Sequence, residues 1–444
     1  MQPRYNWQWI EAQTAQAIEV WHDSVSPRLG AGPRFTRSEQ RLREKAYDEG
    51  MRAVEREVRR TPRSQPERIA TQERITAAFA RFAATALGLE AEAVHLLTHD
   101  FLPVGTQLGR WARRFDPDLG RADILQACRN AWTACGLQPL LGDRPELTPS
   151  ILGYSLLYPY SDNYLDRTDV SRETKLRFSE RFRDRLRGEA LAVLDQREAA
   201  IWALVQLIEE QYPRMLYPLV FDSLLAIHRA QEESLAQLRS GSRCSDADLL
   251  RLTCAKGGSS LLADACLAHG SLTQEESRFS FEWGLLLQLG DDLQDVHEDL
   301  QRGSVTLFSR AAALGTPLDG LTRQLLCFSE RVGARMDNLP HGTMTLKSLM
   351  KMSWRSLILG AVANAREFFS PGFFEEAECR SQFRFKFLRS RQKRSMRRQG
   401  LYASVFDALV EGPAEEDLET SLPDYRLASL LEEDVESAAL SAAV

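Results

Sequence analysis

The spacing of apolar residues is the feature that most limits what this chain can fold into. Between about residues 67 and 369, apolar side chains recur three and four positions apart, as in Ile201, Leu204, Val205 and Ile208. This is the period of an amphipathic α-helix, whereas a half-buried strand would alternate with a period of two. Because no sustained alternation of that kind is present, the pattern predicts an all-α protein.

Clusters of Gly, Pro, Ser and Asp divide the helical region into separate helices. They lie at 136–149, 240–246, 270–273 and 313–317, and residues of these types usually end or precede a helix. The intervals leave room for helices of about 15 to 25 residues. Because one core can grow to about 250 to 300 residues before it divides, we expect residues 66–375 to form a single helical domain.

The two ends of the chain differ from this middle region. Residues 27–66 are dense in Arg, Pro, Ser and Glu, which predicts a solvated arm around a short charged helix, and we expect residues 1–65 to form a charged arm or short helices. Residues 376–400 form a basic segment with nine Lys or Arg and no acid between 380 and 398. Residues 401–444 are expected to be a flexible acidic tail, since residues 411–444 reverse the sign with ten acids against one Arg.

Charge and composition exclude several classes of function. The net charge is −6, so the chain as a whole does not attract nucleic acid. No apolar run approaches the roughly 18 residues of a membrane helix, and the first residues lack the pattern of a secretory signal. The seven cysteines include no C-x-x-C pair, which argues against a disulfide framework or a thiolate zinc site. We therefore expect a cytoplasmic protein.

The stretch 284–303, GLLLQLGDDLQDVHEDLQRG, carries the strongest chemical signal. Spacings of three and four place Asp291, Asp292, Asp295 and Asp299 along one helix face. Like charges at these spacings repel, and the preceding turns are apolar, so we expect a cation to neutralise the row. Oxygen ligands without Cys suit Mg²⁺, which usually completes its shell with phosphate oxygens. The row predicts a Mg²⁺ site for a phosphate or diphosphate, and the alternative is a solvated helix face.

A second acidic pair lies upstream, in LLYPYSDNYLDRTD. Asp162 and Asp166 are four residues apart and share a helix face, and Asp169 extends the row by three. Two acidic rows that face each other across a helical bundle can clamp several Mg²⁺ ions around one diphosphate. The alternative for this pair is an acidic helix start beside a capping Ser161.

Together these motifs resemble those of the class I isoprenoid synthases. GLLLQLGDDLQD resembles the second Asp-rich motif of trans-prenyl diphosphate synthases, with Leu287 in place of a Phe, and the following VHED is similar to that of the squalene and phytoene synthases. DNYLD resembles the first motif of those head-to-head synthases and the D-Y-L-D segment of the large-terpene synthases. AKGGSSLL is similar to the prenyltransferase segment whose Lys contacts diphosphate, here Lys256. The resemblance covers residues 95–370.

This resemblance implies a fold and a set of site residues. The fold is all-α, a class I isoprenoid synthase-like helical bundle with a central active-site cavity, and about three Mg²⁺ ions are the expected cofactors. The implied catalytic residues and metal ligands are Asp162, Asp166, Asp291, Asp292 and Asp295, with Asp299 as a further metal ligand. The candidates for binding the diphosphate are Lys256, Arg251 and Arg302, although both arginines could equally be ion-paired.

The implied function is that of a Mg²⁺-dependent class I terpene synthase. Such an enzyme ionises a prenyl diphosphate and releases diphosphate to give a cyclic or linear terpene. The G-G-K-R-x-R segment that binds isopentenyl diphosphate in chain-elongating enzymes has no match here, Leu119-Gly-Arg121 being nearest, so a lyase is favoured over a transferase. The alternatives are a prenyltransferase, by chain elongation or by squalene/phytoene-type coupling, and a helical prenyl-diphosphate-binding protein without turnover.

The basic segment bears on the expected partners. Phe383, Phe385 and Phe387 interleave the cations of residues 380–398. This pattern leaves three interpretations open, namely a solvated helix, a peripheral contact with an anionic membrane, and a lid that closes over the diphosphate. We expect a prenyl diphosphate substrate and no nucleic acid, and the sequence leaves a homodimer open.

Overall fold

A computed structural model describes most of the chain. It covers residues 4–30, 32–59, 64–167, 169–238, 244–397, 406, 408, 410, 422, 423 and 425–427, without the side chains of 162, 166, 235–238 and 395–397. Regular structure in these residues is helical throughout, with no strand, so the all-α prediction is confirmed. None of the helices within these ranges is long and apolar enough to cross a membrane.

The helices follow one another in a single chain order. They are α1 (Trp7–His22), α2 (Arg37–Val58), α3 (Gln65–Ala86), α4 (Ala91–His95), the π-helix η1 (Leu96–Phe101), α5 (Leu102–Phe115), α6 (Arg121–Leu141), α7 (Pro149–Asp166), α8 (Arg172–Arg187), α9 (Gln196–Gln211), α10 (Pro218–Leu238), α11 (Asp246–His269), α12 (Gln274–Gln294), α13 (Val296–Arg302), α14 (Leu307–Ala313), α15 (Asp319–Asp337), α16 (Met344–Asn364), the 3₁₀-helix η2 (Arg366–Phe368), α17 (Pro371–Glu378) and α18 (Phe385–Arg397).

Three of the four expected helix breaks are confirmed, between α10 and α11, between α11 and α12, and between α14 and α15. The fourth prediction placed a break too early. Helix α6 continues through Gly136 and Pro139 and ends only at Gly142, whose φ of 98° is the left-handed value that glycine adopts most easily. Pro139 stands in the last turn of α6, where it has no amide hydrogen to donate back to the carbonyl of Cys135.

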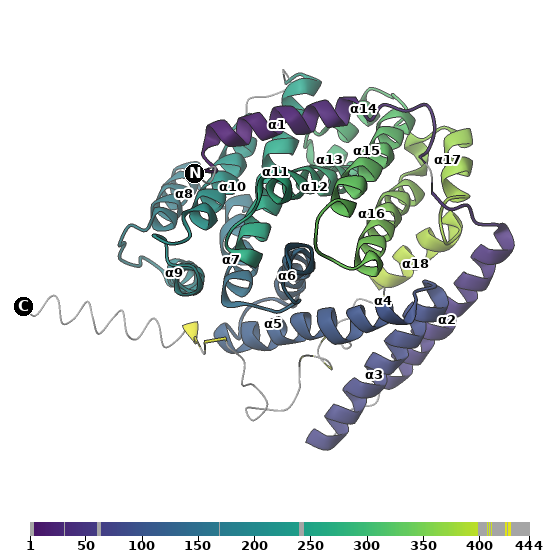
Figure 1. Cartoon of the computed structure of the whole chain (residues 1–444), viewed down its shortest axis with the longest axis horizontal. Coiled ribbons are helices and arrows are strands. Elements are labelled where there is room, and N and C mark those ends of the chain that lie inside the picture. Colours follow the sequence, from purple (N-terminus) through teal and green to yellow (C-terminus); the bar gives the residue numbers. More distant parts are fainter. Residues whose placement is uncertain are drawn as a thin grey trace, which may run out of the picture.

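Helix α6 lies in the middle of the bundle, with α5, α7 and α11 packed against it (Figure 1). Small buried residues, including Ala127, Cys128, Ala131 and Cys135, allow these neighbours to approach closely. Another face of α6 carries Leu125, which is partly exposed. The helix therefore has one face in the core and one face that is open to a ligand or to solvent.

Helices α11 and α12 make the closest helix pair in the part of the chain that is described. At their crossing, a Cβ on Gly284 would lie 2.0 Å from the carbonyl oxygen of Gly257, and a Cβ on Gly257 would lie 2.5 Å from that of Gly284. Only glycine fits at this contact, because any side chain would force the two backbones apart. The crossing brings Lys256 of α11 beside the last turns of α12.

Helix α1 packs across the α11–α12 pair. It crosses α11, α12 and α15 (Figure 1), and Ile10, Ala17 and Trp21 of its apolar face are buried. Tyr5, which precedes it, is also buried, and its hydroxyl lies 2.7 Å from Ser277 Oγ. The N-terminal residues are thus part of the core around α11 and α12, which their composition did not reveal.

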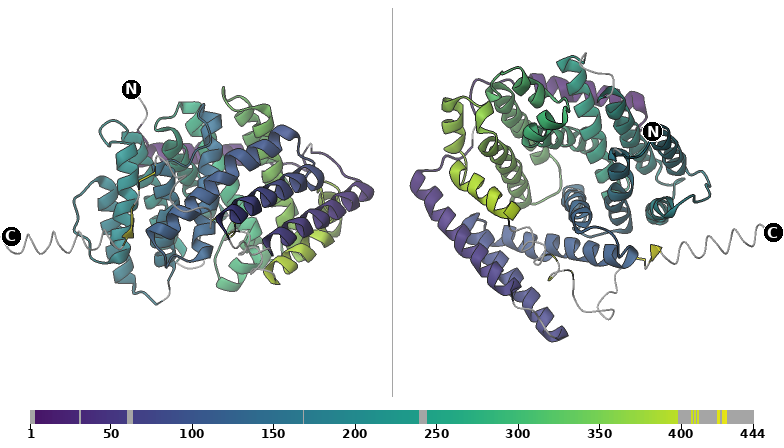
Figure 2. Two further views of the ribbon diagram at one scale, coloured as in Figure 1. Left: turned by 90° about the horizontal axis from the view of Figure 1, so that it is seen from below. Right: turned by 180° about the vertical axis from the view of Figure 1, so that it is seen from behind.

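Helices α2 and α3 form a long hairpin that projects from the body (Figures 1 and 2). The charged helix expected between residues 27 and 66 is not short, because α2 runs for 22 residues from a capping box at Thr36 and Glu39. The boundary expected at residue 65 falls inside this hairpin, at the start of α3.

The basic segment packs on the hairpin and on α16. Arg384 Nε donates to Glu44 Oε1 over 2.9 Å, Arg391 donates to Asp48 Oδ2 over 2.9 Å, and Phe385 is fully buried. Arg384 and Arg391 therefore have acidic partners on α2. Because these contacts lie within the chain, they favour a structural role for this part of the segment.

Described residues of the C-terminal segment also touch the body. The Trp111 indole donates to the carbonyl of Pro423 over 2.8 Å, and Arg110 Nε donates to that of Val410 over 3.1 Å. Val410 and Leu427 are buried. At these residues, the segment that we expected to be a flexible tail lies against α5.

Candidate functional site

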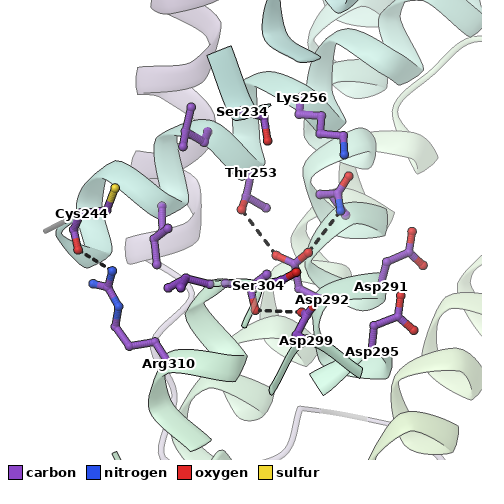
Figure 3. A pocket seen from close by; sticks show the side chains of 15 residues that line it. Ser234, Cys244, Thr253, Lys256, Asp291, Asp292, Asp295, Asp299, Ser304 and Arg310 are labelled. Atoms are coloured by element: carbon purple, nitrogen blue, oxygen red, sulfur yellow. Dashed lines mark hydrogen bonds between the residues drawn. The ribbon is translucent and has the colours of Figure 1, made fainter. Parts of the chain in front are cut away.

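A pocket of about 260 Å³ opens among helices α10 to α14 (Figure 3). It lies beside the α11–α12 crossing. The four carboxylates of the acidic row line one side of it, together with Lys256. Its remaining lining residues are Ser234, Cys244, Leu249, Leu252, Thr253, Gln288, Ser304, Val305, Thr306 and Arg310.

The acidic row spans the junction of two helices. Helix α12 ends at Gln294 and α13 begins at Val296, with Asp295 between them at φ −94° and ψ 8°. This sparsely populated backbone region is one where many active-site residues stand. The amide of Asp295 still donates to the carbonyl of Asp291, and that of Asp299 to the carbonyl of Asp295, both over 2.8 Å, so the helical path continues across the junction.

The position of the row is electrostatically unfavourable. Asp291 and Asp292 stand in the last turn of α12, which contains no basic residue. The carbonyl end of a helix carries partial negative charge, so it destabilises carboxylates placed there. This cost adds to the repulsion within the row.

The four carboxylates divide into two pairs (Figure 3). Asp292 faces α11, where Thr253 Oγ1 donates to it over 3.4 Å, and Gln288 Nε2 donates to its other oxygen over 3.1 Å. Asp299 accepts from Thr306 Oγ1 over 3.4 Å. Asp291 and Asp295 lie next to each other on the other side. The first pair is held by neighbouring side chains, whereas the second is available to a ligand.

Burial raises the pKa of every carboxyl in the row. Burial, followed by the charge of Asp295, raises the pKa of Asp291 to about 6. Asp292 is only 7% exposed, and burial raises its pKa to about 7. Burial and Asp295 raise the pKa of Asp299 to about 6, and burial raises that of Asp295. The charged forms therefore lack compensation within the described part of the protein.

Three cations surround the row without pairing with it. Lys256 is half-buried, and its charge lowers the pKa of both Asp291 and Asp292. Arg129 of α6 acts in the same direction on Asp291 and Asp295 from across the bundle. Neither forms an ion pair with the row within 4.0 Å. Arg310 enters the pocket from α14, but it pairs with Asp246 over 2.8 Å.

The two other predicted diphosphate ligands are ion-paired. Arg251 lies 3.7 Å from Glu233 and does not line the pocket. Arg302 lies 2.6 Å from Glu298 and is largely exposed, although its charge reaches Asp295 and Asp299. Of the three predicted cations, Lys256 is the one that lines the pocket.

The first acidic row lies on the last turns of α7, but the side chains of Asp162 and Asp166 lie outside the described residues. Between them, Asn163 Nδ2 donates to Asp123 Oδ1 at the start of α6 over 2.8 Å. Asp169 is exposed and paired with Arg167, which lowers the pKa of Asp169 to about 2. Asp169 therefore already has a cationic partner.

The donors of the second row fit Mg²⁺. Among the described residues, no three His, Cys, Asp or Glu side chains are placed to share one ion. Mg²⁺ does not require three, because it is commonly held by one or two carboxylates with waters and phosphate oxygens. Asp291 and Asp295 supply two oxygen ligands that are accessible, repel each other and form no salt bridge within the described residues, and thus match this ion.

The structure adds residues that sequence reasoning did not select. Thr253 and Gln288 orient Asp292, and Arg129 faces the row from α6. Gln288 stands four residues before Asp292, so its helical spacing could have indicated the contact. Arg129 had no such signal, because only the packing of α6 beside α11 and α12 brings it near.

Comparison of the sequence with protein-family models and with curated proteins gave no match. The all-helical architecture is compatible with an isoprenoid synthase-like bundle.

Proposed function

We propose that this protein is a Mg²⁺-dependent class I terpene synthase that ionises a prenyl diphosphate. One observation carries the proposal. Asp291 and Asp295 are an adjacent acidic pair at the carbonyl end of α12 that forms no salt bridge among the described residues, and desolvation raises the pKa of both. Their side chains reach the surface, and the charges of Lys256 on α11 and Arg129 on α6 act on the pair. A site that is costly in the free protein is expected where a bound cation offsets the cost.

The cations have a distinct role in this proposal. Lys256 of α11 and Arg129 of α6 both act on the charge of Asp291, so they would contact the phosphate oxygens of a diphosphate bound beside it. As the allylic carbon–oxygen bond breaks, negative charge accumulates on the departing diphosphate. Groups already aimed at that charge stabilise the transition state more than the ground state.

The metal would be held by the acidic rows. Mg²⁺ ions, when bound, supply Lewis-acid stabilisation of the leaving diphosphate. Asp291 and Asp295 would hold the metal from α12, with Asp162 and Asp166 of α7 as the opposing ligands. Asp292 would instead fix the end of α12 against α11, because both of its oxygens already accept hydrogen bonds.

The prenyl chain needs an apolar path away from the pocket, whose volume suits a metal-bound diphosphate. Helix α6 offers one. Leu125 and Trp132 are each 37% exposed, and their spacings of four and three residues from Arg129 place all three along one face. Tyr158, 38% exposed, stands one turn before Asp162 on α7. These side chains would exclude water from the carbocation formed by ionisation.

The test is release of diphosphate from C10, C15, C20 and C25 prenyl diphosphates, measured with Mg²⁺ and with EDTA. Products are extracted and identified by mass spectrometry. Mg²⁺-dependent release from a single substrate, with a hydrocarbon or an alcohol as product, is the expected outcome. Diphosphate that binds and stays intact with every substrate would overturn the proposal in favour of a binding protein.

Added co-substrates separate the remaining alternatives. Release that requires isopentenyl diphosphate would identify a chain-elongating prenyltransferase. Release from two identical substrates, with a coupled product whose formation responds to NADPH, would identify a head-to-head synthase. The control is Asp337→Asn, since Asp337 pairs with Lys351 on the surface of α15, and this variant should behave as the wild type.

A further inference from the structure

The π-helix η1 contains a second group of metal-binding side chains, far from the acidic row in sequence. Residues 95–101, HLLTHDF, join α4 to α5. A π-helical turn is rare and often marks a functional position. His95 is the last residue of α4 and His99 lies within η1, four residues later, and both are exposed.

The two imidazole rings are stacked. Their centroids are 4.3 Å apart, and their planes differ by 19°. A zinc–nitrogen bond is about 2.0 to 2.1 Å, so one ion can bridge two nitrogens up to about 4 Å apart. The rings would have to turn out of this parallel stack before both could point a nitrogen at one ion, and their exposed positions leave room for that rotation.

A buried hydroxyl lies against His99. Thr98 is 5% exposed, and its hydroxyl can donate to the carbonyl of Val94, 2.8 Å away. The same oxygen lies 2.8 Å from His99 Nδ1, and when it accepts a hydrogen bond there, Nδ1 carries the hydrogen. Nε2 of His99 then presents its lone pair. This is how a neighbouring group prepares a histidine to bind a metal.

We propose that His95 and His99 bind a divalent transition ion, with waters as the remaining ligands. Two imidazoles favour Zn²⁺, Ni²⁺ or Cu²⁺ over Mg²⁺, so this site would take a different class of ion from the carboxylates of α12. The proposal is independent of the proposed enzymatic function, because it concerns other residues and another ligand chemistry.

Binding at η1 would hold the junction of α4 and α5. The carbonyl of Phe101, the last residue of η1, accepts a hydrogen bond from the indole of Trp132 over 2.7 Å, which ties the turn to α6. An ion that joins His95 to His99 would therefore stabilise the turn and its contact with α6. Since the unfolded chain does not hold the two rings together, binding should raise the melting temperature.

The test uses the full chain without an affinity tag, freed of metal by a chelator, with Ni²⁺ as the probe. Calorimetric titration and thermal melts are compared for the wild type, His95→Ala, His99→Ala and Thr98→Val. We expect one Ni²⁺ site in the wild type, at least about tenfold weaker binding in either histidine variant, and about tenfold weaker binding in Thr98→Val.

Two controls make the result decisive. Thr98→Ser keeps the hydroxyl and should keep the wild-type affinity, and His22→Ala removes another exposed histidine and should change nothing. Equal Ni²⁺ affinity in the wild type and in His95→Ala/His99→Ala, or no binding by the folded wild type, would overturn the proposal. Circular dichroism checks that each variant is folded, and diphosphate release is scored separately.

Discussion

Two regions of this protein each carry a run of like charges in the sequence, but their charges have different surroundings in the structure. Two cations of the basic segment are compensated, since Arg384, just before α18, and Arg391 on α18 pair with Glu44 and Asp48 of α2. The acidic row on α12 and α13 is not, since neither Asp291 nor Asp295 forms a salt bridge within the described residues, and burial raises the pKa of both.

The difference shows how to interpret a run of like charges. A charge that meets an opposite charge within the chain contributes to the fold, and its loss leaves the partner buried and unpaired. A buried charge without a partner costs stability in the free protein, so it is expected where a ligand supplies the missing charge. Substitutions in the two regions should therefore affect stability with opposite signs.

The largest effect is expected on activity. Asp291→Asn combined with Asp295→Asn, and separately Asp162→Asn, should lower Mg²⁺-dependent diphosphate release by about 10³-fold or more, because each removes a proposed metal ligand. Steady-state release measures the loss, and circular dichroism should show an intact helical signal. Near-normal turnover in either variant would show that these carboxylates do not hold a catalytic metal ion.

A third type of buried charge gives the next effect. Asp264 of α11 is 1% exposed, accepts a hydrogen bond from Asn130 and has no cation beside it, and burial raises its pKa to about 8. The folded protein therefore binds a proton that the unfolded chain releases near pH 4. The wild type should lose stability as pH rises from about 4 to about 8.

Asp264→Asn removes this dependence, because the amide is never charged. It should gain free energy of unfolding over the wild type with rising pH, by an amount on the order of several kcal/mol at pH 8. Urea unfolding at pH 5, 6.5 and 8 measures the difference. A constant difference across this range would mean that Asp264 does not titrate there.

In the basic segment, Arg384→Gln should destabilise the protein. Glu44 is 5% exposed, and without Arg384 it keeps a buried charge that lacks its partner. We expect a loss of about 2 to 4 kcal/mol in the free energy of unfolding, with an unchanged Mg²⁺ requirement. Chemical denaturation measures the loss, and Lys386→Gln, at an exposed position of the same helix, is the matched control.

In the acidic row, the single substitution Asp291→Asn should stabilise the metal-free protein. The pKa of Asp291 is raised, so its ionised form costs stability above about pH 6, and the neutral amide avoids that cost. We expect a gain of at most about 1 kcal/mol at pH 7.5 in EDTA, because Asp291 is exposed and solvent screens its charge, and no gain at pH 4. Destabilisation at pH 7.5 would erase the contrast between the two regions.

The sequence by itself determined the helical class and the acidic row. Period-3.6 spacing is a local property, so the all-α prediction and three of the helix breaks required no knowledge of packing. The spacings of Asp291, Asp295 and Asp299 likewise fix which side chains share a face. Composition did not reveal that the N-terminal residues pack in the core. The burial of Tyr5 and Trp21 depends on the helices they contact and not on their neighbours in sequence.

Only the tertiary structure decided how the charges are used. The sequence predicted both Arg251 and Lys256 as diphosphate ligands. In the structure, Arg251 pairs with Glu233, whereas the Gly257–Gly284 crossing places Lys256 beside the acidic row. Arg129 faces the row from another helix, and Arg384 and Arg391 pair with acids that lie more than 300 residues earlier in the chain. Helical spacing governs contacts within a few turns, whereas compensation of a charge depends on which elements the fold brings together.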